Sequence, residues 1–163
     1  MAYKAVYHGG IVILASFAVA FVLVMLPLPD ILLVYRPQWV TLILIYWCMA
    51  LPHRVGIFTG WFVGFLLDIH YGSILGQHAI TLASIAYLSY RLHVRIRLYP
   101  LLQQSLIILV LVSLSQMMLL WISGIVGQAP GSWSYWLPSL TSMLIWPWVF
   151  YLMRNVRRVY GVN

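Results

Sequence analysis

The stretch that decides the fold is residues 101–125, LLQQSLIILVLVSLSQMMLLWISGI, which contains no charged side chain. At about 1.5 Å per residue, a helix of this length spans about 38 Å, and the hydrocarbon core of a bilayer is roughly 30 Å thick. Turn-forming residues follow it at 127–132, GQAPGS. This stretch therefore predicts a helix that crosses a membrane.

The rest of the chain has the same apolar character. Of 163 residues, 64% are hydrophobic and 7% are charged, against roughly 45–50% and about 25% in a soluble domain. Nine Lys and Arg and two acidic residues are too few to cover the surface of a soluble globule. We therefore interpret the net charge of +7 as loop charge that orients the chain in a membrane, and we expect no nucleic-acid binding.

Hydropathy predicts an all-helical protein with one membrane domain over residues 1–163. The first span is not interpreted as a cleaved signal peptide, because the apolar run continues beyond Ala18-Val19-Ala20. The second span is apolar only over Trp39–Leu51, about 20 Å of helix, so it must include the residues before it. The predicted spans are about 9–26, 31–51, 55–71, 72–90, 101–125 and 136–153.

Basic residues give the orientation of these spans. With the N-terminus inside, eight of the nine basic residues lie on the cytoplasmic side and Arg36 alone lies outside. This distribution requires an even number of spans. Six is preferred, and the alternative is four, with residues 31–71 as a shallow hairpin. The predicted cytoplasmic basic rim consists of Arg54, Arg91, Arg95, Arg97, Arg154, Arg157 and Arg158.

A second group of polar residues is predicted inside the spans. Counting from the inner boundaries, Arg36, Asp68, His78 and Gln116 all lie about 20–24 Å toward the outside. Ionisable groups in a membrane are costly unless paired, so we expect an ion pair between Arg36 and Asp68, with His78 and Gln116 nearby. Two interpretations of this intramembrane polar layer stay open. It fixes the register of the helices, or it lines an outward-facing cavity for a small solute or a proton path.

Glycines recur at every fourth position of the third span. Gly56, Gly60 and Gly64 share one helix face, which predicts close approach of another helix. That helix belongs either to the same chain or to a partner protein.

Motifs for enzyme chemistry are not found. The sequence has no HExxH, Walker A or GxGxxG motif, and its two acids lie on different predicted helices. The single Cys48 excludes an internal disulfide, and the His70–His78 spacing has little metal specificity. We expect no enzyme activity, cofactor or metal.

Several motifs occur along the chain: Arg36-Pro37-x-Trp39, Tyr46-Trp47, Leu51-Pro52-His53-Arg54-Val55-Gly56, Gly60, Gly64, Asp68-x-x-x-Gly72-Ser73-x-Leu75-Gly76, Trp146-Pro147-Trp148 and Met153-Arg154-x-Val156-Arg157. Together they resemble the family of rod shape-determining membrane proteins MreD, of the Gram-negative type, and residues 36–78 carry the most specific part.

The resemblance implies a non-enzymatic inner-membrane component of the cell-elongation machinery, which builds the lateral peptidoglycan wall. It implies MreC as the most direct partner, with MreB, RodA and the elongation transpeptidase as members of the complex. The six-helix arrangement is also similar to the substrate-binding subunits of energy-coupling-factor importers.

Two functions are therefore expected. The first is an intramembrane scaffold that binds a partner helix through the glycine face or a groove, with its basic rim on anionic lipid or the cytoplasmic filament. The second is a small-solute binder or transporter that uses the polar layer. A homodimer is also an open expectation.

Overall fold

A computed structural model describes the backbone of residues 3–162 and the side chains of residues 9–162. Every regular element in this part of the chain is helical, which confirms the all-helical prediction. The elements are α1 (Tyr3–Met25), α2 (Asp30–Leu33), α3 (Trp39–Ala50), α4 (Ile57–Tyr71), α5 (Gln77–Leu98), α6 (Leu101–Ile125), the 3-10 helix η1 (Trp133–Trp136) and α7 (Leu137–Val159).

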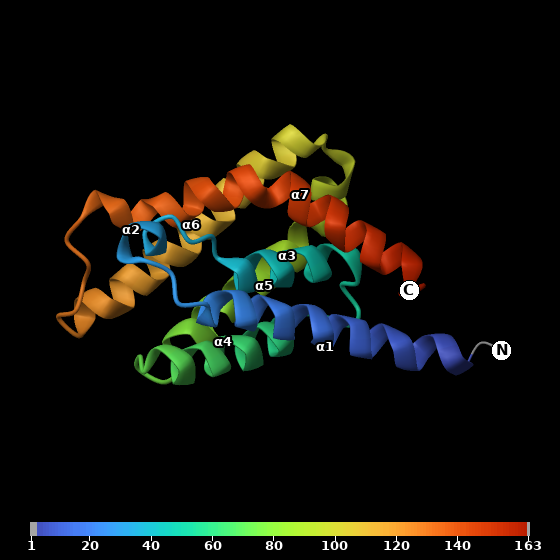
Figure 1. The fold of residues 1–163 in the computed structure, drawn as a ribbon, viewed down its shortest axis with the longest axis horizontal. Helices are drawn as coiled ribbons and strands as arrows, with labels where there is room; N and C mark the ends of the chain where they lie inside the picture. Colours follow the sequence, from blue (N-terminus) through green and yellow to red (C-terminus); the bar gives the residue numbers. More distant parts are fainter. Residues whose placement is uncertain (1–2, 163) are drawn as a thin grey trace.

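The long helices run back and forth between two ends of the molecule (Figure 1). We call the end that holds the start of α1 and the end of α7 the terminal end. The connections 51–56 and 99–100 also lie there. The far end holds the connections 26–38, 72–76 and 126–132. The first and last helices therefore begin and finish on the same side, as an even number of crossings requires.

Helix α3 lies at the centre of the fold. All its residues from Val40 to Ala50 are buried, and it packs against α1, α5 and α7. Trp47 is fully enclosed, and its indole Nε1 donates to Ser16 Oγ of α1 over 2.8 Å. Because other helices surround α3, the backbone groups at its ends would face protein and not lipid, although the helix is short.

The predicted single span 31–51 is interrupted in the structure. Helix α2 ends at Leu33, and α3 begins at Trp39. Pro37 lies between them; proline cannot donate a backbone hydrogen bond and disfavours helical geometry in the residue before it. The interruption leaves an irregular segment at the far end, where it lines a cavity described below.

The outer surface is rich in large apolar side chains. Phe58 of α4 is 90% exposed, Leu102 of α6 is 80% exposed and Trp148 of α7 is 72% exposed. By length and composition, α6 is the one described helix that is long and apolar enough to cross a membrane, and only a third of its most apolar window is buried. Shorter apolar segments are Gly9–Met25, Trp39–Ala50 and Ile57–Tyr71.

Candidate functional site

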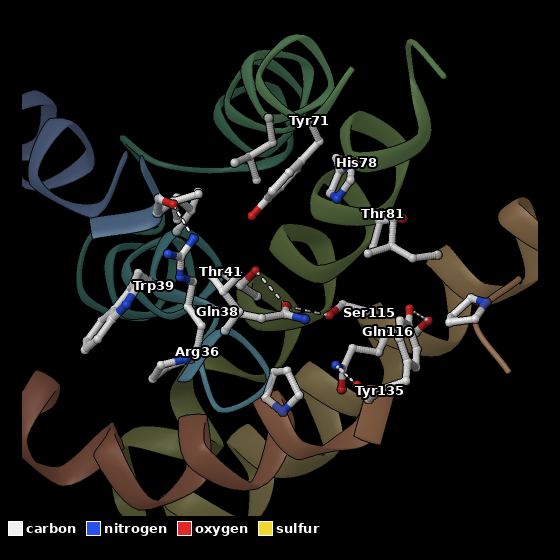
Figure 2. Close-up of a pocket in the computed structure, with 18 of the residues that line it drawn as sticks. Arg36, Gln38, Trp39, Thr41, Tyr71, His78, Thr81, Ser115, Gln116 and Tyr135 are labelled. Atoms are coloured by element: carbon white, nitrogen blue, oxygen red, sulfur yellow. Dashed lines mark hydrogen bonds between the residues drawn. The ribbon is translucent and has the colours of Figure 1, made fainter. Parts of the chain in front are cut away.

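The far end contains a cavity of about 530 Å³. It is enclosed by the segment before α3, the end of α4, the start of α5, the middle of α6 and the loop before α7 (Figure 2). Leu67, Leu82 and Leu119 supply apolar walls. The polar and aromatic side chains labelled in the close-up are Arg36, Gln38, Trp39, Thr41, Tyr71, His78, Thr81, Ser115, Gln116 and Tyr135.

Asp68 holds one wall of this cavity in place without lining it. Its side chain is completely buried. Its carboxylate accepts hydrogen bonds from the backbone N–H of Gly76 over 2.9 Å and of His78 over 2.8 Å, and from Ser73 Oγ over 2.8 Å. His78 Nδ1 lies 2.8 Å from the same carboxylate and forms the ion pair when the imidazole is protonated. Asp68 therefore joins the end of α4 to the first turn of α5.

The expected ion pair between Arg36 and Asp68 does not form. The Arg36 guanidinium instead donates to the backbone oxygens of Val24 and Leu26, at the end of α1. A cation is favourable there because the last carbonyls of a helix have no partner within the helix and carry partial negative charge. The sequence correctly indicated that both charges need partners, but it could not show that backbone groups would supply them.

Gln38 connects three elements at the centre of the cavity. Its Oε1 accepts hydrogen bonds from Thr41 Oγ1 over 3.1 Å and from Ser115 Oγ over 3.2 Å. Its backbone N–H donates to Ser142 Oγ of α7 over 3.1 Å. In Figure 2 the Gln38 side chain extends between Thr41 and Ser115.

Gln116 and Tyr135 form a reciprocal pair on the opposite wall. Gln116 Nε2 donates to the Tyr135 carbonyl, and the Tyr135 hydroxyl donates to the Gln116 carbonyl, each over 2.7 Å. Burial raises the pKa of Tyr135 to about 12, so its hydroxyl stays a donor at neutral pH. Within the described structure, Gln116 Oε1 and Arg36 Nε are buried and have no hydrogen-bond partner. Such atoms are uncommon in native proteins.

Three residues of the predicted polar layer, Arg36, His78 and Gln116, line this one cavity, with Asp68 behind His78. The cavity is also lined by residues that were not predicted, namely Gln38, Thr41, Ser115 and Tyr135. They are uncharged, and the sequence gives no charge signal to distinguish such residues from ordinary polar positions of a membrane helix.

The glycine face is occupied by a helix of the same chain. A Cβ atom on Gly60 would lie 2.7 Å from the Leu82 carbonyl oxygen, and one on Gly64 would lie 2.6 Å from Ala79 Cα. Both contacts are with α5. Gly56 has no heavy atom within 4 Å of its Cβ position. Of the two alternatives for this face, the structure supports packing within the chain for Gly60 and Gly64.

The predicted basic rim lies at the terminal end, on the connection before α4, the last turns of α5 and the last turns of α7. Arg97 Nη2 donates to the Ala50 carbonyl over 2.6 Å, and Arg157 Nε donates to the Val162 carbonyl over 3.1 Å. Arg54 packs against Gly9 of α1. The remaining members, Arg91, Arg95, Arg154 and Arg158, are exposed.

Metal binding finds no support among the described residues, since no three His, Cys, Asp or Glu side chains gather in a way that could hold an ion. Cys48 is buried in α3.

Comparison with known proteins identifies the family. The family model described as rod shape-determining protein MreD matches residues 7–156. The rod shape-determining protein MreD of Haemophilus influenzae is 34% identical over 146 residues, which are 90% of this chain and 90% of that protein. No solved structure matches the chain significantly. The family model covers nearly the whole chain, and the sequence of the Haemophilus influenzae protein aligns with 90% of it. This chain therefore belongs to the rod shape-determining protein family MreD.

Proposed function

We propose that this protein is a non-enzymatic scaffold of the cell-elongation machinery in the bacterial inner membrane. It crosses the membrane six times with both ends in the cytoplasm, and its far-end cavity faces outward. The apolar exterior, the even number of passes and the arginines at the terminal end support this orientation. Membership of a family named for rod shape determination supports the role.

Its direct partner in this proposal is MreC, and the docking site is the far-end cavity. The observation that carries this assignment is the cavity itself, which is lined by polar side chains from several elements, Arg36 and Gln116 among them. Gly60 and Gly64 are already covered by α5 and are not available to a partner helix. MreB, RodA and the elongation transpeptidase are then members of the same complex.

The size of the cavity limits what can enter it. The far-end cavity, at about 530 Å³, is in the size range of pockets that hold a small molecule or a few side chains. A whole membrane helix, about 30 Å long, would extend well beyond it. We infer that the partner inserts a short segment or a few side chains.

Photocrosslinking tests this docking site. A photoreactive phenylalanine replaces Leu119, which lines the cavity, or Leu106, which is 57% exposed on the same helix but outside the cavity. In cells that also produce MreC, we expect the probe at 119 to capture MreC and the probe at 106 to capture it at least tenfold less. Equal capture at both positions, or none at 119 while the two proteins still copurify, would contradict docking in the cavity.

A small-solute binder or transporter is the second candidate function. The same cavity falls within the range of roughly 300–1,000 Å³ that is usual for pockets that bind small organic molecules. Native mass spectrometry after gentle extraction separates the two functions. A metabolite that is bound to the natural chain and lost in Gln116→Leu would favour solute binding. If the natural chain carries no bound metabolite and still crosslinks to MreC, the scaffold is favoured.

A further inference from the structure

A second, smaller cavity lies at the terminal end and gathers positive charge. It has a volume of about 220 Å³ and is lined by the end of α3, the end of α5 and the last turns of α7. Three arginines from two helices surround it: Arg97 of α5, and Arg154 and Arg157 of α7. Tyr46 and Phe150 contribute aromatic walls, with their ring centroids 5.9 Å apart.

The arginines of this cavity, which we call the arginine pocket, have no acidic side chain to neutralise them. The chain contains only two acids, Asp30 and Asp68. Asp30 begins α2 at the far end, and Asp68 is committed to the turn before α5. Burial and the neighbouring Arg157 lower the pKa of Arg97, because both effects penalise its positive charge. A bound anion would relieve this repulsion.

Existing hydrogen bonds hold two of the three guanidinium groups in position. Arg97 is fixed to the carbonyl of Ala50, the last residue of α3, and Arg157 to the carbonyl of Val162. Each of these bonds uses a single nitrogen, and a guanidinium has five N–H donors, so both groups keep free donors. Arginine donors arranged around a small volume match the oxygens of a phosphate group.

We propose that the arginine pocket binds the phosphate of an anionic phospholipid headgroup from the inner leaflet. Basic pockets between membrane helices on the cytoplasmic side are suited to such headgroups. On the same helices, Leu98 directly follows Arg97 in α5 and is 79% exposed, and Leu152 lies two residues before Arg154 in α7 and is 64% exposed. Both helices therefore offer apolar surface to acyl chains at this level. These apolar neighbours favour a lipid over free phosphate. The inference uses the proposed membrane orientation, but it does not depend on what fills the far-end cavity.

Lipid titration of the purified full chain in neutral detergent tests the proposal. The thermal unfolding midpoint is followed while phosphatidylglycerol, phosphatidylcholine or inorganic phosphate is added. We expect phosphatidylglycerol to raise the midpoint in a saturable way, and neither of the other two to do so at equal concentration. Stabilisation by inorganic phosphate alone would overturn the lipid assignment, and equal stabilisation by both lipids would overturn the site.

Matched arginine variants locate the effect. A direct hydrogen bond from an arginine to a phosphate is expected to change affinity about tenfold, so Arg97→Gln with Arg154→Gln should weaken phosphatidylglycerol binding roughly 100-fold. Arg91→Gln with Arg95→Gln removes the same charge from α5 outside the pocket and should weaken it less than threefold. Arg154→Lys keeps the charge and should bind within a few-fold of the natural chain, which separates lost binding from misfolding. Equal loss in the two double variants would overturn the pocket.

Discussion

The Asp68 side chain, which belongs to α4, caps the N-terminus of α5. The residue before α5 is Gly76, which has no side chain to accept hydrogen bonds from the first turn of that helix. The buried Asp68 carboxylate accepts from the N–H groups of Gly76, His78 and Ala79 instead. Its charge is also favourable at this position, because the N-terminus of a helix carries partial positive charge.

The variant Asp68→Asn should therefore lose stability and not merely lose charge. An amide keeps one acceptor oxygen but turns an NH₂ group toward backbone donors, so several hydrogen bonds to a charged group are weakened. We expect a loss of about 2–3 kcal/mol and a fall of roughly 4–12 °C in the unfolding midpoint in detergent. The matched variant Asp30→Asn changes an exposed carboxylate and should leave the midpoint nearly unchanged. If the two variants unfold at the same temperature, the capping role is wrong.

Helices α4 and α5 pack closely against each other, because Gly60 and Gly64 place no side chain between them. Leu82 and Ala79 of α5 lie where Cβ atoms on Gly60 and Gly64 would be. The repeated spacing in the sequence predicted such a close approach. It could not identify the partner helix, because the spacing describes only one of the two surfaces in contact.

Replacing these glycines by alanine tests the pairing. Gly60→Ala and Gly64→Ala each force α4 away from α5, and overpacking of this kind costs about 1–3 kcal/mol. Gly10→Ala adds the same methyl group inside α1, at an exposed position with no atom within 4 Å, and should not destabilise the fold. Thermal unfolding of the three purified variants measures the difference. A Gly10→Ala variant as unstable as Gly64→Ala would show that the cost does not come from the contact with α5.

The boundaries of the elements show how far hydropathy can predict structure. Helix α6 begins and ends at 101 and 125, as the sequence predicts, because Pro100 and the turn residues after it limit the apolar run. Helices α5 and α7 continue past their predicted spans to Leu98 and Val159. Hydropathy shows where the apolar side chains end, and not where the helix ends. The helices continue through the arginines that follow, because arginine is a good helix former and its charge is favourable near a helix C-terminus.

At the scale of the whole molecule, the sequence indicated the helical class and the family, and it grouped the charges of the basic rim. It left open that the polar layer lines a cavity, but it did not predict the terminal-end cavity or the uncharged side chains that line the far-end cavity. Both cavities form where side chains from several elements meet, such as Gln38, Ser115 and Tyr135 at the far end, and neither the separation of these residues in sequence nor their polarity reveals that contact. The second span was expected to run without a break over residues 31–51, whereas the interruption before α3 creates one wall of the far-end cavity.

These two cavities give the molecule two chemically different ends. The far end is mixed, with an arginine, neutral amides and hydroxyl groups around an apolar space. The terminal end is basic and has no acidic side chain. A membrane would separate these ends, so the proposal assigns protein docking to one side and lipid binding to the other.

Single-cysteine labelling in intact cells tests this arrangement most directly. Ser132→Cys places a thiol on the exposed far-end connection, His53→Cys places one on the exposed terminal-end connection, and the natural Cys48 is buried. With a membrane-impermeant maleimide that reaches the periplasm, six spans predict labelling of Ser132→Cys in intact cells and of His53→Cys only after the inner membrane is opened. Labelling of His53→Cys from outside, or protection of Ser132→Cys until lysis, would contradict the account.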